Sequence, residues 1–100
     1  MRPDEYKEKR EACQYILAYL LDNPDAGDTF DGIVEWWLLT QNIKFETRTV
    51  SKAVASLVAE GLIVEQKGFD SRNVYRIKQT KESRERILSR LREIKTLLHD

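Results

Sequence analysis

Apolar side chains recur every three or four positions along most of this 100-residue chain, which is the period of amphipathic helices. The exception lies between residues 62 and 78, where apolar and β-branched residues form two short runs around a polar turn. The pattern predicts one hairpin and four helices, the helices at about 4–22, 30–40, 46–60 and 80–98. No repeat or low-complexity tract divides the chain, so a single domain over residues 1–100 is expected.

The predicted helices have recognisable ends. Pro24 stops the first helix, because proline disfavours helical geometry at the residue before it. Asp28 or Thr29 can cap the second helix, since their side-chain oxygens accept hydrogen bonds from the first free backbone N–H groups. Thr80 or Ser83 starts the last helix in the same way.

The third predicted helix leads directly into the hairpin. Its buried face is a stripe of valine and leucine that begins at Val50, and Gly61 supplies a left-handed C-terminal cap. Residues 62–65 form an apolar, β-branched strand, residues 67–73 a polar turn, and residues 74–78 the return strand. The fold class expected is therefore mainly α with a small β-hairpin.

This order of helix, glycine, strand, turn and strand resembles the C-terminal half of a winged helix-turn-helix domain, in the form found in small bacterial and archaeal repressors. The resemblance covers about residues 28–78, and its most specific runs are Thr49-Val50-Ser51-Lys52 and Leu57-Val58-Ala59-Glu60-Gly61-Leu62-Ile63. It implies a winged-helix core over residues 1–80. A reading helix at about 46–60 would enter the major groove of DNA, and a wing at 67–73 would contact the minor groove or the backbone.

Opposite its buried stripe, the third helix carries two cations among small side chains. Arg48 and Lys52 lie in its N-terminal half, where a reading helix first meets base edges, and Thr47 and Ser51 lie beside them. An ordinary solvated helix face can have the same composition. Glu46 departs from the family, which usually has a serine-like cap there. Its carboxylate would repel phosphate, unless it caps the helix or accepts from a cytosine amine.

Four further cations lie on or beside the hairpin. The interpretation that follows from the resemblance is phosphate contact from Lys67, Arg76 and Lys78, with Arg72 at the tip entering a minor groove. Two alternatives remain open. The charges can keep a short sheet edge solvated and unpaired, and Arg72 can form a structural ion pair with Asp70.

The net charge of the chain is zero, which is unusual for a DNA-binding domain, because phosphate neutralisation supplies much of the affinity. The charge is unevenly spread, however. Residues 1–40 have 4 Lys/Arg and 9 Asp/Glu, a net charge of −5. Residues 41–80 have 7 and 4, and residues 81–100 have 6 and 4, giving net charges of +3 and +2. The basic part therefore coincides with the predicted reading helix and wing.

The last helix has apolar residues at steps of 4, 3 and 4, the spacing of a coiled-coil seam. A winged-helix core does not require such a helix, and in related repressors it makes the dimer. We therefore expect a homodimer in which residues 81–100 dimerise, with an interface of Ile87, Leu91, Ile94, Leu98, Trp36 and Leu39. The alternative is that this helix covers the core of its own chain.

Candidate chemistry beyond binding is sparse. His99 is a single histidine near the C-terminal end of the sequence, and Cys13 lies on an apolar stripe where a buried, inert thiol is expected. No cysteine–histidine cluster has metal-ligand spacing and no glycine-rich phosphate loop occurs, so neither enzymatic activity nor a metal or cofactor is expected. Aromatic residues at 15, 19, 36 and 37 could line an inducer pocket, although core packing is the favoured interpretation.

The expected function is sequence-specific binding of double-stranded DNA by a dimeric transcriptional regulator. With one cysteine, no signal-peptide pattern and no apolar run of membrane-spanning length, the expected location is the cytoplasm, with no membrane partner. The alternative is a winged-helix module that binds other proteins within a larger assembly. The zero net charge, Glu46 and the extra apolar stripe at Trp36 and Leu39 support that alternative.

Overall fold

A computed structural model describes residues 3–37, 46–68 and 72–98 of the chain. Its elements are α1 (Pro3–Asp22), β1 (Gly27–Asp28), α2 (Phe30–Gly32), the π-helical turn η1 (Ile33–Trp37), α3 (Thr47–Ala59), β2 (Val64–Lys67), β3 (Asn73–Arg76) and α4 (Lys81–Leu98). The molecule is mainly helical with a small three-stranded antiparallel sheet, which is compatible with a winged helix.

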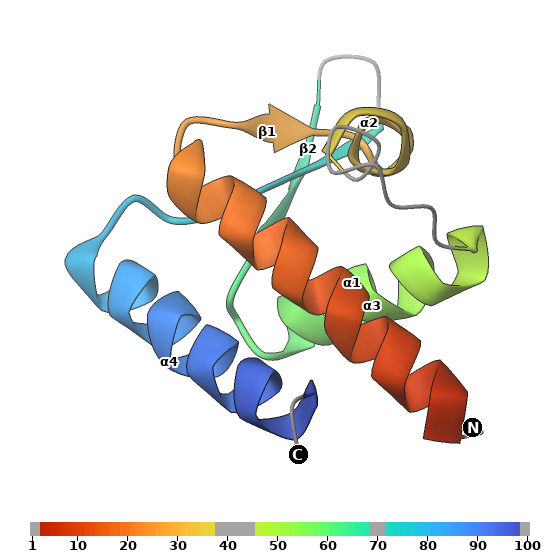
Figure 1. Cartoon of the computed structure of the whole chain (residues 1–100). Helices are drawn as coiled ribbons and strands as arrows, with labels where there is room; N and C mark the ends of the chain where they lie inside the picture. The colour runs from red at the N-terminus through yellow and green to blue at the C-terminus, as the bar shows by residue number, and fades with distance from the viewer. Residues whose placement is uncertain (1–2, 38–45, 69–71, 99–100) are drawn as a thin grey trace.

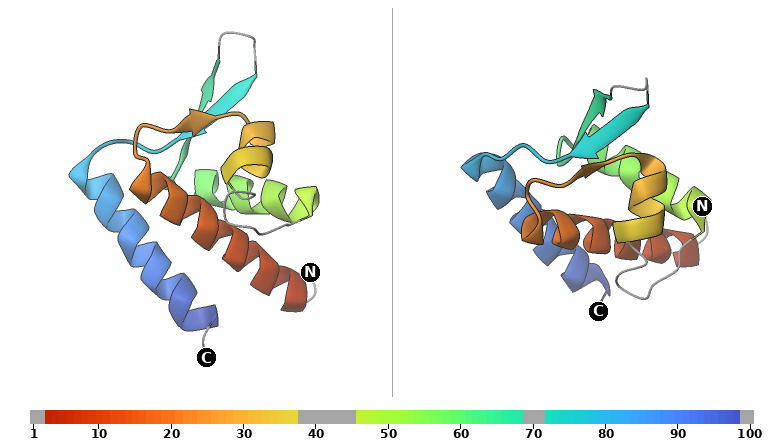
Figure 2. Two further views of the ribbon diagram at one scale, coloured as in Figure 1. Left: turned by 45° about the horizontal axis from the view of Figure 1, so that its top comes forward. Right: turned by 90° about the horizontal axis from the view of Figure 1, so that it is seen from above.

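Helix α1 lies at the centre of the molecule and packs against both α3 and α4 (Figure 1). Helix α4 runs alongside α1 in the opposite direction, and the sheet covers the end of the helices where α1 finishes and α4 begins (Figure 2). A single apolar cluster joins these parts. Its largest fully buried side chains are Ile16, Leu17, Leu20, Ile33, Val50, Leu57, Ile63, Ile87 and Ile94.

The position of α4 corrects the assignment of its apolar seam to a dimer interface. Ile87 and Ile94 are fully buried within this chain, and Leu91 is 7 % exposed. These three side chains are part of the core that α1 and α4 share, so the alternative of packing within one chain is the one the structure follows. The other members of the expected interface, Leu39 and the side chains of Trp36 and Leu98, lie outside the part of the chain that the structure describes.

Local hydrogen bonds explain where the helices begin. Thr29 Oγ1 accepts from the backbone N of Gly32 at 3.2 Å, and Thr80 Oγ1 accepts from the backbone N of Ser83 at 3.1 Å. Both bonds satisfy a donor that has no partner inside its helix. Of the candidate caps, Thr29 rather than Asp28 therefore caps α2, and Thr80 rather than Ser83 caps α4.

The end of α3 is a Schellman motif. Gly61 has a φ of 75°, in the left-handed region that glycine adopts without a steric penalty. Leu62 N donates to Leu57 O at 3.0 Å and Gly61 N donates to Val58 O at 3.0 Å, the two bonds that define the motif. Leu57 and Leu62 are both buried, so the turn also directs the chain from the core towards β2.

The sheet has the order β1-β3-β2, and both pairs are antiparallel. The hairpin strands are offset from the predicted ones: β2 begins at Val64 rather than Leu62, and β3 ends at Arg76 rather than Lys78. Strand β1 was not predicted, because its two residues, Gly27 and Asp28, have no strand propensity and are strand only through pairing with β3. The hairpin projects beyond the helices (Figure 2).

Candidate nucleic-acid interface

The outward face of α3 is the first part of the candidate interface. Thr47, Arg48, Ser51 and Lys52 are all exposed, whereas the opposite face is buried from Thr49 onwards. The amphipathic period of the helix produces this division, since its valines and leucines recur at helical spacing towards α1. The structure thus brings together, on the first two turns of α3, the four residues that the sequence assigned to base reading.

Glu46 lies immediately before this face and does not cap the helix with its side chain. Its backbone is extended, and its carbonyl oxygen accepts from Val50 N at 3.1 Å, but the side chain makes no capping hydrogen bond. The suggestion that the carboxylate caps α3 is therefore wrong. The carboxylate is exposed at the positive end of the helix dipole, where it offsets part of the charge of Arg48 and Lys52.

Strand alternation decides which hairpin residues face α3. Glu65 pairs with Tyr75 and Lys67 with Asn73, so these four side chains share the face of the sheet turned towards the core. Lys67 is exposed near the tip, on the same side as α3. Arg72 is also exposed, and its proposed pairing with Asp70 involves a residue outside the described part of the chain.

Arg76 lies on the opposite face of the sheet. It pairs with both Val64 and Gly27, and its side chain passes directly over Gly27. A Cβ atom placed on Gly27 would be 2.8 Å from Arg76 Nη2, so the missing side chain leaves the room that the guanidinium uses. The structure therefore places Arg76 on the face of the hairpin away from α3, whereas Lys67 shares the face turned towards α3.

An open groove separates the exposed face of α3 from the hairpin, and sequence reasoning missed it. Its volume is about 370 Å³, and it is lined by Phe30, Ser51, Val54, Ala55, Val58, Ala59, Glu65 and Tyr75. The two alanines are exposed and small, so a partner could approach the helix closely. The groove forms because the strand register places Tyr75 and Glu65 opposite α3. The residue pattern of one strand does not specify that register, so the groove could not be predicted from it.

Tyr75 and Glu65 form the polar part of this groove. The phenol donates a hydrogen bond to the Glu65 carboxylate, and the tyrosine is half-buried against the core. Burial is the main cause that raises the pKa of Tyr75 above its ordinary value of 10.0, and the hydrogen bond and charge of Glu65 raise it further. Glu65 therefore places a carboxylate on the face of the hairpin that is turned towards α3.

Helix α4 holds the C-terminal end of α3 in place. Arg86 Nη2 donates to the Glu60 carbonyl oxygen at 2.6 Å, where the last turn of α3 has carbonyls without helical partners. Arg90 Nε lies 3.0 Å from Glu60 Oε1, an ion pair whose N–H is not aligned as a hydrogen bond. Arg90 also donates from Nη1 to Glu93 Oε2 at 2.9 Å. Two arginines of α4 thus contact Glu60, the residue that follows α3.

The remaining candidate residues are structural. Cys13 is 5 % exposed, and burial is the main cause that raises the pKa of its thiol to about 11, which confirms the expectation of a buried thiol. Tyr15 and Tyr19 pack against the core, as the packing interpretation predicted. Across residues 3–37, 46–68 and 72–98 no group of three or more His, Cys, Asp or Glu could hold a metal ion. His99 lies outside those ranges.

Comparisons with protein-family models, with curated proteins and with solved structures find no match to this chain. Within the ranges that the structure covers, no helix combines the length and the apolar character needed to cross a bilayer. The assignment of a function therefore rests on the geometry of α3, the hairpin and the groove between them.

Proposed function

We propose that this chain binds duplex DNA rather than catalysing a reaction, with α3 in the major groove and the β2–β3 hairpin against the adjacent backbone or minor groove. The observation that supports this most is the shared exposure of Thr47, Arg48, Ser51 and Lys52 on the first two turns of α3. The projecting hairpin beside that helix adds Lys67 and Arg72. Helices that read DNA contact base edges from their N-terminal turns in the same way.

The charges predict weak binding by a single copy. The proposed interface has four exposed cations, Arg48 and Lys52 on α3 and Lys67 and Arg72 on the hairpin, and Glu46 and Glu65 oppose them. Counterion release from about four phosphates gives a slope of log K against log salt of about −4 for one copy, and about twice that for two. A regulator that acts as a dimer would place two α3 helices on half-sites about one turn of DNA apart.

The test is selection of sites from a pool of random duplexes, followed by fluorescence anisotropy with the selected duplex at several salt concentrations. Lys52→Glu should weaken binding by roughly tenfold or more, because it replaces a phosphate or base contact with a repulsive charge. Arg92→Glu is the matched control, since it makes the same charge change at an exposed position of α4. Absence of any duplex binding at low salt would overturn the proposal.

A second candidate function, binding of another protein, is favoured by one observation. The groove between α3 and the hairpin is lined mainly by apolar side chains and contains the carboxylate of Glu65. The variant Ala55→Lys distinguishes the two functions, because Ala55 is exposed in that groove and lysine is compatible with a helix. An added cation should preserve or strengthen DNA binding, whereas it should abolish retention of a partner protein that packs on the apolar groove.

A further inference from the structure

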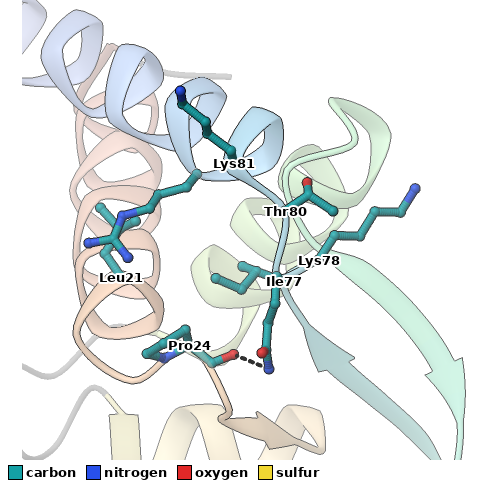
Figure 3. A pocket seen from close by; sticks show the side chains of 8 residues that line it. Leu21, Pro24, Ile77, Lys78, Thr80 and Lys81 are labelled. Carbon is teal, nitrogen blue, oxygen red and sulfur yellow. Dashed lines mark hydrogen bonds between the residues drawn. The ribbon is translucent and has the colours of Figure 1, made fainter.

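A second hollow lies away from the outer face of α3, where β3 leaves the sheet and α4 begins (Figure 3). Its volume is about 330 Å³, within the range of about 300–1,000 Å³ that small-molecule sites occupy. It is lined by Leu21, Pro24, Ile77, Lys78, Gln79, Thr80, Lys81 and Arg84. The lining thus comes from the end of α1, the turn after it, the β3–α4 connection and the first turn of α4.

The floor of this hollow is aliphatic. Ile77 is 5 % exposed and belongs to the core, while Leu21 and Pro24 are half-buried beside it. None of the eight lining residues is aromatic, so the floor offers no ring face for stacking. Its chemistry therefore suits an alkyl chain.

Hydrogen bonds fix one wall of the hollow. The Gln79 amide donates from Nε2 to the Pro24 carbonyl oxygen at 3.2 Å and to Asp25 Oδ1 at 2.7 Å. The first of these bonds is drawn in Figure 3. The connection to α4 is thereby tied to the turn that follows α1, and the Asp25 carboxylate accepts a hydrogen bond from the same amide.

Three cations form the rim. Lys78, Lys81 and Arg84 are exposed, and the aliphatic stems of such side chains can extend an apolar surface while their charged ends stay in water. Lys81 and Arg84 lie in the first turn of α4, where the helix dipole is unfavourable to positive charge. An anion bound between them would relieve that repulsion, as well as pairing with the two side chains.

We propose that this hollow binds a small amphiphilic anion, with an aliphatic tail on Leu21, Pro24 and Ile77 and a carboxylate-like head among Lys78, Lys81 and Arg84. The site is separate from the DNA interface proposed above and does not depend on it. Residues 77–80 continue directly from β3, so an occupant would contact the segment that joins the hairpin to α4.

Octanoate is the probe, and the measurement is a titration followed by the backbone amide resonances of the ¹⁵N-labelled full chain. Octanoate should produce saturable shifts centred on residues 21–24 and 77–84. Acetate keeps the charge without the tail, and 1-octanol keeps the tail without the charge, so each should bind at least about tenfold more weakly. Equal binding by either of them, or octanoate shifts centred elsewhere, would overturn the proposal.

The double variant Lys81→Gln/Arg84→Gln tests the rim. It should bind octanoate about fivefold or more weakly, since exposed ion pairs make individually modest contributions. Arg92→Gln/Lys95→Gln removes the same charge from the exposed far end of α4 and should bind like the parent. An unchanged affinity in the rim variant would contradict the assignment. If that variant does not fold, as judged by its thermal melt, the comparison of the three probes on the parent chain decides.

Discussion

The thiol of Cys13 lies between α1 and α3, with Sγ 3.9 Å from the carbonyl oxygen of Ala53. Burial is the main cause that raises its pKa to about 11, and it outweighs the opposing charge of Lys9. Because the thiolate is the nucleophilic and redox-active form, this thiol is unreactive at neutral pH in the folded protein. Its position on α1 therefore serves packing.

The raised pKa predicts how stability changes with pH. The pKa of the thiol is about 11 in the folded state, whereas in the unfolded chain it has its ordinary value of 9.0. Its contribution to stability is therefore fully present below pH 9 and is lost as pH rises towards 11. Between these values the parent should lose about 2 kcal/mol more of its unfolding free energy than Cys13→Ala. Urea unfolding at several pH values measures this difference.

The same series contains its own control, because the cavity left by Cys13→Ala lowers stability by a similar amount at every pH. Tyrosine and lysine groups that titrate in this range are common to both proteins. Parallel pH profiles for the two proteins would show that Cys13 does not titrate as its burial requires.

At the scale of elements, the junction between α3 and α4 depends on Glu60. Its carbonyl oxygen is held by Arg86 and its carboxylate by Arg90, while Gly61 turns the chain away immediately afterwards. The side chains of Arg90 and Glu60 are 29 % and 36 % exposed, so solvent screens their attraction.

A double-mutant cycle with Glu60→Gln and Arg90→Gln should give a coupling energy of about 0.2–1 kcal/mol from urea unfolding. Arg90→Gln combined with Glu82→Gln is the control, because Glu82 lies two turns away on α4 and the two effects should add. A Glu60–Arg90 coupling of zero would mean that the ion pair does not stabilise the junction, and that Arg86 makes the polar contact that does.

Sequence patterns located most elements, because helices and their ends are determined locally. Thr29, Thr80 and Gly61 cap helices where the residue types indicated, and α3 differs from its predicted range by one residue at each end. Strand β1 was missed because Gly27 and Asp28 become strand only through a distant partner. The π-helical turn at 33–37 was missed because apolar spacing does not reveal a shift in backbone hydrogen bonding.

The candidate interface could be predicted only in part for the same reason. The exposure of Arg48 and Lys52 follows from the period of one helix. The position of Arg76 on the far face, and the meeting of Tyr75 with Glu65 opposite α3, depend on the strand register. The hollow under the β3–α4 connection depends on how α1 and α4 pack, which no single segment encodes.

At the scale of the whole molecule, α4 completes the core of its own chain. Ile87 and Ile94 are fully buried there without a second copy. A dimer would therefore have to use other surfaces. Among the described residues, the exposed large apolar side chains are Tyr6 and Leu88, which are 45 % and 38 % exposed.

Ile94→Ala should consequently lower the free energy of unfolding by about 2–5 kcal/mol, the range for large-to-small changes in a core. The urea midpoint should not depend on protein concentration, because the lost contacts are within one chain. Leu88→Ala, on the exposed side of the same helix, should change stability by no more than about 0.5 kcal/mol. If the urea midpoint of the parent rises with protein concentration and that of Ile94→Ala does not, α4 forms a dimer interface after all.

Strand β1 pairs with β3 only at Tyr75 and Arg76, so the hairpin beyond that point is held by its own two strands. Insertions towards the tip therefore leave the core unchanged. Two residues added to each strand between the Glu65–Tyr75 pair and the Lys67–Asn73 pair would extend the hairpin by about 7 Å and keep Lys67 on the side of α3. One residue added to each strand at the same place would turn Lys67 to the side of Arg76. The length of this hairpin is thus adjustable in steps of two residues.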